Sequence, residues 1–588
     1  MRIKFSFCLF LISLVCYTLL KAQNTAIVEG TVRDASTKER IVGATVFLLS
    51  DKSKATSTDA DGAFKLAIPF GKQRLVCSFI SMLSDTFMLE SDSSKSNIYH
   101  INFLLKSSEK QLQTVVISAG KFEQKIEDIT VSMEVLKPSV IEHRNTTNIK
   151  SALEQTPGLN ILDGEPQIRG GSGFSFGVGS RVATLIDGIP VMAGDAGRTE
   201  WNFIPVENIE QVEVIKGASS VCYGSSALSG TINIRTAYPK DQPLTKVNLY
   251  SGLYSAPKND SAKWWTGMNN FSGFNFLHSH KFGQVDLVIG GLASYDHGYI
   301  GPPLEHPYLP IKADTITNPD VAERNGRLNF NFRFRPAKIT GLSMGINGNF
   351  MLSHNNFSLV WNDDTNGIYR AFPGTMTISD RSILYVDPFV SFTTKSGFKQ
   401  DLKGRYFYTN NQNSNNQSNE CTVTYYEYQA HQQFKKLGDL NLTAGFVANL
   451  SYSHANLYAA SGSPNNQLNN YSAYAQLDKK FWKRLNLSFG FREEYFKMNA
   501  EKVQLQPILR SGLNLQLTRG TYLRASYGQG YRYPTITEKY ILTSTGGITI
   551  FPNDSLVPEK SSNSEIGLKQ GFKIGNFMGF AVVAAFWQ

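Results

Sequence analysis

One short motif in the chain matches a pattern that hydrolases use for nucleophilic attack. Residues 173–177 read Gly-Phe-Ser-Phe-Gly and fit G-x-S-x-G, in which a serine on a sharp turn attacks the substrate. That turn needs a strand before the serine and a helix after it, but here glycines lie on both sides and no helix signal follows. We therefore interpret the segment as a glycine-rich loop and expect no catalytic residue and no enzymatic activity.

The histidines and cysteines form no recognisable metal site. None of the nine histidines is followed by Glu one or three residues later, so the His-Glu spacings of zinc peptidases are absent. Two of the five cysteines lie in the N-terminal apolar run. The other three, Cys77, Cys222 and Cys421, are too far apart for a C-x-x-C site and cannot build a disulfide framework. We expect no bound metal and no cofactor.

The composition excludes several classes of protein. The chain has 588 residues, 58 Lys+Arg against 48 Asp+Glu, and a formal net charge of +10. These basic residues are spread along the chain, which argues against a nucleic-acid partner. Charged residues are 18% and aromatic residues 12%, values that exclude a disordered or coiled-coil protein. Outside residues 5–20 there is no run of about 18 apolar residues, so the sequence excludes a helical membrane protein.

The N-terminus carries an export signal. Arg2 and Lys4 precede the apolar run at 5–20, and Ala22 is a small residue at a plausible cleavage point. We predict a signal peptide at residues 1–22, with an N-terminal membrane anchor as the alternative.

Residues 23–106 are predicted to form a small β-sandwich. Short apolar segments alternate with turns such as Asp-Ala-Asp-Gly at 59–62. Three stretches, 30–34, 43–46 and 58–64, resemble the carboxypeptidase-regulatory-like domain. The resemblance implies a binding or spacer module rather than a catalytic one.

An isolated β-prone segment follows at residues 111–119, with polar residues on both sides. A lone strand has unpaired backbone groups and is suited to add to the sheet edge of another protein. The alternative is a last strand of the sandwich. The segment resembles the TonB box of outer-membrane receptors, which implies that it binds TonB through five residues: Thr114, Val115, Val116, Ile117 and Ser118.

Residues 120–237 carry the most specific pattern. We expect a helix from Asn145 to about Gln155, ending before Pro157 and Gly158. The ordered blocks Ile-Arg-Gly at 168–170, Ile-Glu-Gln-Val-Glu-Val-Ile-Lys-Gly at 209–217, Tyr-Gly-Ser-Ser-Ala at 223–227 and Gly-Thr-Ile-Asn-Ile at 230–234 are similar to the plug domain of TonB-dependent receptors. The resemblance implies an α/β plug domain.

From residue 238 to 588 the chain is predicted to be all strand. Leu328, Phe330 and Phe332 alternate with Asn329 and Asn331, and similar alternation recurs along the segment. We count fifteen candidate strands, and the connections between them are mostly alternately long and short. That pattern is typical of a transmembrane antiparallel β-barrel, with apolar residues facing lipid and polar residues facing the lumen. The overall fold class is therefore mainly β.

The strand count raises an expectation about completeness. Plugged transporters have 22 strands and bacterial single-chain barrels have an even number. About fifteen strands leave such a barrel open. We therefore expect the sequence to be a C-terminally truncated piece of a longer receptor.

The family resemblance implies a location and partners. It implies the outer membrane, with the N-terminal domain in the periplasm and with TonB, outer-membrane lipid and a small-molecule ligand as partners. Arg169 and Lys216 fall where the family places plug cations that pair with barrel glutamates, and Glu565 matches one such glutamate. These three residues are a candidate latch between plug and barrel.

The same resemblance implies active, TonB-dependent uptake of a scarce ligand. A ferric siderophore is the expected cargo because it is the commonest in the family. The alternatives are a cobalamin importer, a SusC-type glycan importer and a surface signalling receptor. The SusC type usually has a glycine–tyrosine–glycine element after the TonB box, whereas Ser118-Ala119-Gly120 stands here.

Overall fold

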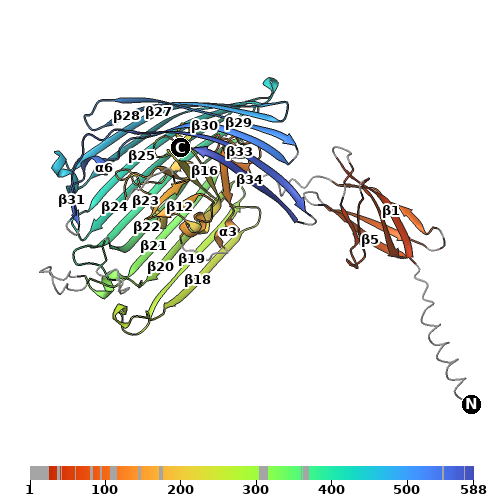
Figure 1. The fold of residues 1–588 in the computed structure, drawn as a ribbon, viewed down its shortest axis with the longest axis horizontal. Helices are drawn as coiled ribbons and strands as arrows, with labels where there is room; N and C mark the ends of the chain where they lie inside the picture. Colours follow the sequence, from red (N-terminus) through yellow and green to blue (C-terminus); the bar gives the residue numbers. More distant parts are fainter. Residues whose placement is uncertain are drawn as a thin grey trace, which may run out of the picture. The chain divides into compact units, whose positions relative to one another are not determined.

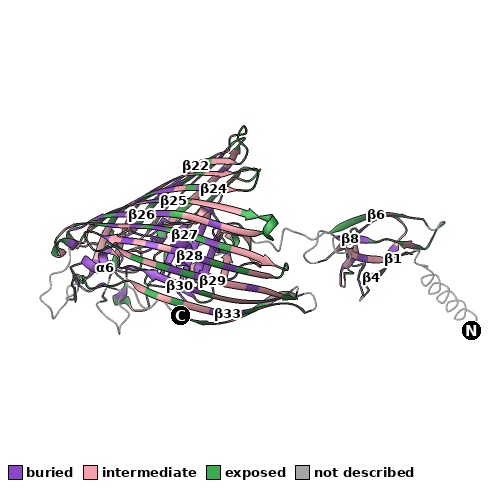
Figure 2. Cartoon of the chain, turned by 90° about the horizontal axis from the view of Figure 1, so that it is seen from above, coloured by how far each residue is buried: buried purple, intermediate pink, exposed green. Residues whose placement is uncertain are grey.

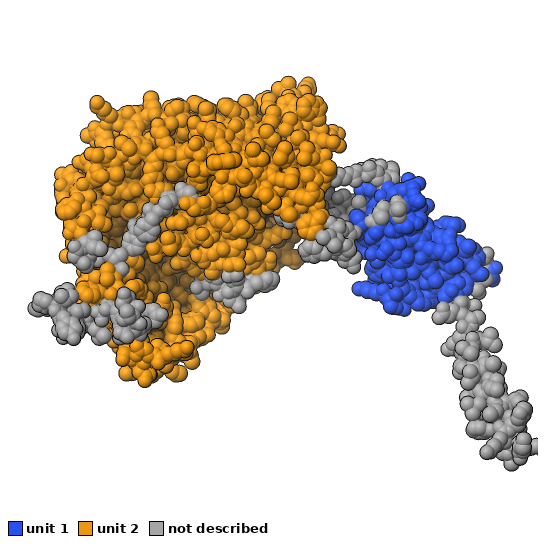
Figure 3. All heavy atoms as spheres, in the orientation of Figure 1, with its two compact units in different colours: residues 1–115 blue, residues 116–588 orange. Residues whose placement is uncertain are grey.

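The computed structural model describes residues 25–588 except 36–39, 42, 60, 80–83, 93, 95, 106–114, 143–147, 171–176, 304–315, 359, 362–369, 519, 546–547 and 575–576. The chain divides into two compact units, residues 1–115 and 116–588 (Figure 3). The predicted signal peptide, Thr114 and residues 173–176 of the serine motif lie outside the described residues.

The first unit is a sandwich of two β-sheets, as the sequence predicts (Figure 1). One sheet has the order β4-β1-β7, with β8 also beside β1, and the other has the order β3-β2-β5-β6. Alternate residues such as Val28, Leu66 and Leu75 point into a shared apolar core. The strands are β1 (Thr25–Asp34), β2 (Thr45–Leu48), β3 (Ala55–Ser57), β4 (Ala63–Pro69), β5 (Gly71–Ser78), β6 (Asp85–Ser91), β7 (Ile98–His100) and β8 (Phe103–Leu105).

The second unit begins with the plug, whose central sheet has the order β11-β16-β17-β14-β15. β14 runs parallel to β17, while β11 and β16 are antiparallel to their neighbours. Two smaller hairpins, β9 with β10 and β12 with β13, lie outside this sheet. The strands are β9 (Val115–Val116), β10 (Gln124–Lys125), β11 (Ser132–Leu136), β12 (Leu159–Leu162), β13 (Glu165–Ile168), β14 (Val182–Ile186), β15 (Ile189–Pro190), β16 (Ile209–Lys216) and β17 (Gly230–Thr236).

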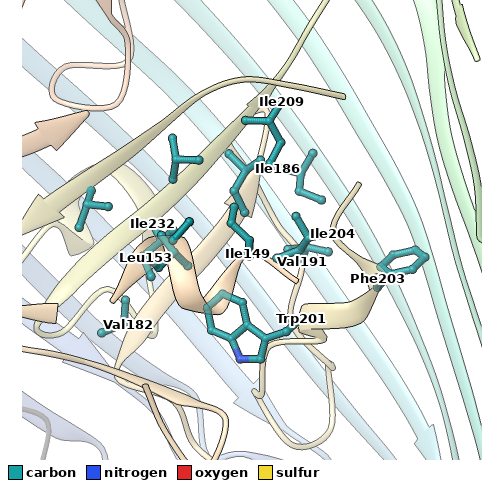
Figure 4. Close-up of a cluster of buried hydrophobic side chains, with 14 of the residues drawn as sticks. Ile149, Leu153, Val182, Ile186, Val191, Trp201, Phe203, Ile204, Ile209 and Ile232 are labelled. Atoms are coloured by element: carbon teal, nitrogen blue, oxygen red, sulfur yellow. The ribbon is translucent and has the colours of Figure 1, made fainter. Parts of the chain in front are cut away.

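Short helical segments pack on one face of the plug sheet and help to close its core (Figure 4), whereas α5 packs with residues of the opposite face such as Leu185. Ile149 and Leu153 pack with Val182, Ile186 and other buried apolar residues. The predicted helix at 145–155 is observed only at 150–153, and residues 145–147 of it lie outside the described part. The helices are α3 (Pro138–Glu142), α4 (Lys150–Leu153), α5 (Ser220–Tyr223) and the 3-10 turns η1 (Trp201–Phe203) and η2 (Val206–Asn208).

A single antiparallel sheet of fifteen strands surrounds the plug, which confirms the strand count (Figure 1). Each strand pairs with the next along the chain. β18 and β34 are the outermost strands and do not pair with each other among the described residues. The strands are β18 (Leu244–Tyr254), β19 (Asn269–Phe282), β20 (Val285–Asp296), β21 (Glu323–Phe334), β22 (Leu342–Ser358), β23 (Met376–Thr393), β24 (Lys399–Asn413), β25 (Asn419–Phe434), β26 (Leu440–His454), β27 (Asn465–Phe481), β28 (Leu485–Met498), β29 (Gln504–Thr518), β30 (Thr521–Arg532), β33 (Glu559–Ile574) and β34 (Phe577–Trp587).

Alternation along these strands separates the two faces of the sheet (Figure 2). In β21, Leu328 is 58% exposed on the outer face, whereas Arg327 and Asn329 are 2% and 3% exposed because they contact the plug. An outer apolar face with a polar inner face is the pattern of a barrel that lies in lipid.

Most of the connections alternate in length as predicted. Short turns follow β19, β21, β23, β25 and β27, and longer loops follow β18, β20, β22, β26 and β30. The connections after β24 and β28, residues 414–418 and 499–503, are as short as the turns. The loops and turns contain η3 (Asp260–Ala262), η4 (Asn318–Val321), η5 (Lys435–Leu437), η6 (Asn456–Ser461), α6 (Ile536–Tyr540), β31 (Thr543–Thr545) and β32 (Ile548–Ile550). Within the part of the chain that the structure describes, no helix has the length and apolar character needed to cross a membrane.

Candidate functional site

The predicted TonB box is docked against the plug sheet. The backbone N–H groups of Ile117 and Ser118 both donate to the carboxylate of Glu213, at N···O distances of 3.1 and 2.7 Å. The hydroxyl of Ser118 accepts from the amide of Asn233 at 2.9 Å, and its carbonyl accepts from the hydroxyl of Tyr223 at 3.1 Å. The segment is therefore held mainly by side chains of β16, β17 and α5.

The docked segment is bent rather than extended. Strand β9 covers only residues 115–116, shorter than the segment that the sequence predicts. In an extended strand, successive N–H groups point in opposite directions. The N–H groups of Ile117 and Ser118 reach the same carboxylate, so the backbone turns at these two residues. Val116 and Ser118 are fully buried, while Val115 is 38% exposed.

Glu213 is the acceptor that makes this docking possible. Its side chain is fully buried in the middle of β16 and also accepts from the amide of Gln211 at 2.6 Å. Arg235 lies 3.5 Å from the same carboxylate. One carboxylate accepts several hydrogen bonds at once, so Glu213 satisfies two backbone donors that have no strand partner. A buried carboxylate in turn needs those donors, because an unpaired buried charge is costly.

A buried ion pair fixes the plug to the barrel directly after the box. Lys121 pairs with Glu427 of β25, and the two side chains are 7% and 3% exposed. The hydroxyls of Tyr474 and Tyr425 donate to the same carboxylate at 2.7 and 3.2 Å. Burial lowers the pKa of Lys121, and the negative charge of Glu427 opposes that effect. The backbone that leads out of the box is therefore tied to the barrel wall.

Two of the three predicted latch residues are in contact. Arg169 Nη1 lies 2.6 Å from Glu565 Oε2, and Arg524 of β30 lies 3.1 Å from the other oxygen of Glu565. The Arg169 guanidinium also lies 4.4 Å from the ring centre of Phe586. Lys216 is not in that pair. Lys216 Nζ lies 3.5 Å from the carboxylate of Glu134 in β11. Ser132 is the residue of β11 that pairs with Lys216, and Glu134 follows it two residues later. The ion pair of Lys216 is therefore inside the plug.

The structure reveals further plug–barrel contacts that sequence reasoning missed. Three arginines that face the lumen bind plug groups: Arg327 pairs with Glu207 at 2.5 Å, Arg381 with Glu200 at 2.5 Å, and Arg405 donates to the carbonyls of Ile189 and Pro190 at 3.0 and 2.8 Å. Arg327 stands at a lumen position of the alternating pattern, which is a usable sequence signal. The sequence gives no signal for the partner of Arg327, because the partner depends on how the plug sits in the barrel.

The opposite end of the plug meets the long loops. The carboxylate of Asp195 accepts from the amide of Asn419 at 2.5 Å and from the hydroxyl of Tyr458 at 3.2 Å. The backbone N–H of Thr537 donates to the carbonyl of the same aspartate at 3.0 Å. A cavity of about 100 Å³ lies between plug and barrel near this end, with Met192 and Asn449 among its lining residues. Ligand pockets typically measure about 300–1,000 Å³, so the cavity holds only part of a ligand of that class.

One acidic residue of the plug has a strongly altered ionisation. Glu165 of β13 is 4% exposed, and its Oε2 atom has no hydrogen-bond partner among the described residues. Burial raises the pKa of Glu165 to about 7, although a hydrogen bond with Ser180 acts in the opposite direction. Among the described residues, no group of three or more His, Cys, Asp or Glu side chains is arranged to hold a metal ion.

Comparison with curated proteins identifies two relatives of part of the chain. The Vitamin B12 transporters BtuB of Vibrio vulnificus strains CMCP6 and YJ016 are 31% and 33% identical over 153 and 205 residues. These matches cover 26% and 34% of this chain. They span 25% and 33% of the transporters' own length.

Solved structures share the fold at low sequence identity. The siderophore receptor PirA of Pseudomonas aeruginosa superposes with a TM-score of 0.58 and 17% identity, over 76% of this chain and 73% of that one. A point mutant of the ferric enterobactin receptor PfeA of the same species, in complex with enterobactin, gives a TM-score of 0.59 and 14% identity, over 78% of this chain and 72% of that one. At these identities the similarity establishes a common fold and nothing more.

Three family models match consecutive parts of the chain. They are the CarboxypepD_reg-like domain at residues 28–117, the TonB-dependent receptor plug domain at 125–231 and the TonB-dependent receptor-like β-barrel at 265–588. The barrel match alone covers more than half of the sequence. The family consists of receptors rather than enzymes. With its plug inside a fifteen-stranded sheet whose outer face is apolar, the chain belongs to the TonB-dependent receptor family of the outer membrane.

Proposed function

We propose that the chain takes up a scarce small ligand across the outer membrane by TonB-dependent transport. The observation that carries the proposal is the docked segment at residues 116–118, whose backbone donors are held by Glu213 inside the plug. A segment held by a few side chains is released more readily than a strand inside a sheet.

TonB binding and docking in the plug compete for the same backbone. TonB is proposed to bind Thr114, Val115, Val116, Ile117 and Ser118 as an added strand at the edge of its own sheet. An added strand is extended, whereas the docked segment turns at Ile117 and Ser118. Straightening these residues removes both N–H groups from Glu213, so TonB binding and release from the plug are one event.

The ion pairs between plug and barrel are proposed to keep the plug in place until that event. Arg169 with Glu565 holds the plug sheet, and Lys121 with Glu427 holds the backbone next to the box. Lys216 contributes indirectly, since its contact with Glu134 joins β11 to β16. A pull on the box reaches Lys121 first because only two residues separate it from Ser118.

The N-terminal sandwich is proposed to lie in the periplasm with TonB. It precedes the box in the chain, so the box and the sandwich share the side of the membrane on which TonB acts. A binding or spacer role fits a small sandwich placed there.

For the ligand we propose a ferric siderophore. The net charge of +10 favours an anionic chelate, and siderophore receptors share the fold over three quarters of the chain. A cobalamin is the second candidate, because relatives at 31% and 33% identity are named as vitamin B12 transporters.

Growth and binding distinguish these ligands. Deletion of the gene is expected to impair growth under iron starvation, with rescue by inorganic iron, and the purified protein is expected to bind ferric chelates. Binding of cyanocobalamin instead, with a growth defect only when vitamin B12 is limiting, would replace the first ligand by the second.

The TonB step is tested separately from the ligand. Val116→Pro removes one N–H and cannot extend a strand ladder, whereas Val116→Thr keeps it. We expect the proline variant to lose capture by the TonB C-terminal domain and uptake while still binding ligand. Capture at the level of the threonine control would argue against strand addition.

A further inference from the structure

Exposed basic residues gather at the short turns of the barrel. Four consecutive short turns, after β21, β23, β25 and β27, carry them. Within these four turns Asp439 is the only acidic residue. Arg335 of the first turn pairs with Asp286, and no ion pair joins the other basic residues of the turns to a described residue. We call the set the basic rim, and it consists of Lys338, Lys395, Lys435, Lys436, Lys483 and Arg484.

Aromatic and aliphatic side chains accompany the basic rim. Trp482 is 82% exposed, Leu437 55% and Ile339 50%. Lys479 Nζ lies 4.8 Å from the ring centre of Phe481. The outer face of β28 continues from the turn with exposed apolar residues such as Phe489. Aromatic residues beside basic ones at the end of an apolar outer face are typical of the boundary between lipid tails and headgroups.

The β27–β28 turn holds Trp482 and Lys483 in a strained backbone conformation. Trp482 and Lys483 have φ angles of 48° and 57°, in the left-handed region. A turn with two successive residues in this region favours Asn-Gly, because bulky residues are strained there. The sequence places a large aromatic residue and a cation at those positions, and both side chains are exposed.

The long-loop end of the barrel has a different arrangement. Its cations stand among acidic residues: Lys539 lies 2.5 Å from Glu501 and Arg532 lies 2.8 Å from Glu538. The exposed lysines at 258, 263 and 502 are within three residues of Asp260 or Glu501 in the chain. A large excess of basic over acidic residues is therefore a property of the four short turns. The plug segment that follows the TonB box lies at the short-turn end, since Lys480 Nζ is 2.6 Å from Asp128.

We propose that the basic rim binds anionic phospholipid headgroups in the leaflet that the short turns reach. The rim follows the outside of the barrel over four neighbouring hairpins, directly beyond the apolar face that contacts lipid tails. Phospholipids already surround the barrel there, whereas a protein partner would need to wrap around it. Lysine and arginine donate charge-assisted hydrogen bonds to phosphate oxygens, and cations near an anionic lipid surface are attracted to it.

Lipid retention by the purified receptor tests this proposal. The full chain in detergent is incubated with equal amounts of phosphatidylglycerol and phosphatidylcholine, and bound lipid is quantified after gel filtration. One variant combines Lys435→Gln, Lys436→Gln and Lys483→Gln. The matched control removes three exposed lysines from the long-loop end: Lys258→Gln, Lys263→Gln and Lys502→Gln.

We expect the parent chain to retain more phosphatidylglycerol than phosphatidylcholine. In the rim variant, the ratio of bound phosphatidylglycerol to bound phosphatidylcholine is expected to fall by about tenfold or more. The loop control is expected to keep the parental ratio. A folded rim variant with an unchanged ratio would overturn the proposal, as would equal losses in both variants.

The salt dependence of lipid binding by the unaltered chain tests the proposal even if the rim variant does not fold. Raising ionic strength from about 0.1 to about 1 M shortens the screening length from about 10 to about 3 Å. The preference for phosphatidylglycerol is expected to fall strongly over that range. A preference that does not change with salt, or no preference at all, would refute the assignment.

Discussion

Substitution of Glu213 by Gln is the sharpest test of how the TonB box is held. The amide has nearly the same shape as the carboxylate, but one of its two acceptor oxygens becomes an NH₂ donor. Both N–H groups donate to the same oxygen, Oε2, whereas Oε1 accepts from Gln211 and lies near Arg235. An NH₂ group at Oε2 removes both bonds to the segment, and an NH₂ group at Oε1 leaves both without charge assistance. The variant therefore weakens docking without removing a side chain from the plug.

The size of the effect follows from those two contacts. Hydrogen bonds to charged groups contribute about 1.5–3 kcal/mol each, against about 0.5–1.5 kcal/mol for neutral ones. Losing the charge assistance of both bonds shifts the docking equilibrium by roughly 2–3 kcal/mol, and losing both bonds shifts it by more. Since about 1.4 kcal/mol is tenfold in an equilibrium constant, the undocked population is expected to rise by at least about tenfold.

Cysteine labelling measures that population. Val116 is fully buried when docked, so a maleimide reaches Val116→Cys only after the segment leaves the plug. The labelling rate follows the open fraction when closing is faster than reaction. Peptide mass spectrometry assigns the label and separates it from the native cysteines. Glu210→Gln on the same strand is the control, because it makes the same charge change at a residue whose side chain is 52% exposed.

Labelling that rises by less than about twofold in the Glu213 variant would refute the reasoning. So would an equal rise in the Glu210 control, because the effect would then come from charge on β16 and not from the docked backbone. Faster labelling in the Glu213 variant alone is the expected result.

Three further substitutions have defined outcomes. Lys121→Met leaves Glu427 buried without its cation, so it is expected to lower the free energy of unfolding by about 3–5 kcal/mol. Chemical unfolding measures this loss, and adding Glu427→Gln should restore most of the lost stability. Glu165 has a folded-state pKa of about 7, above the usual carboxyl value, so the folded plug binds more protons and its stability falls as pH rises from about 4.5 to 7. Glu165→Gln is expected to abolish that slope, which unfolding free energies at both ends of the window would reveal. Arg169→Ala is expected to cost only about 1–3 kcal/mol, because Arg524 remains with Glu565, and to increase ligand-independent TonB capture.

The barrel was predictable because its strand pattern depends only on residues that are close together in the sequence. Lipid on one side and the lumen on the other impose a period of two on every strand, so Leu328 and Asn329 reveal their faces without knowledge of the fold. The alternation of short turns and long loops fixes the hairpin order. The sandwich was predictable for a similar reason, since its turn residues and alternating apolar residues lie close together in sequence.

The contacts of the plug were only partly predictable. Glu565 lies nearly 400 residues from Arg169 in the chain, and family resemblance rather than pattern indicated the pair. The resemblance placed Glu213 in the plug block at 209–217, but nothing local indicates that it binds the backbone of Ile117. Lys216 illustrates the limit, because the register of β11 against β16 places Glu134 within its reach before any barrel residue.

The plug is held by two different kinds of contact, and this difference sets the order in which it yields to a pull. The ring of Phe203 packs on Tyr385 and Phe407 of the barrel, with ring centres 5.5 and 6.0 Å apart, inside an apolar cluster. The segment from Ile117 to Lys121 is held instead by hydrogen bonds and an ion pair.

Water can replace polar contacts at small net cost once it enters, whereas exposing the apolar cluster loses stability in proportion to its area. A pull on the box is therefore expected to free the polar segment while the contact around Phe203 persists. Hydrogen exchange under TonB load would show early exchange at Ile117 and late exchange at Phe203, and the reverse order would contradict this account.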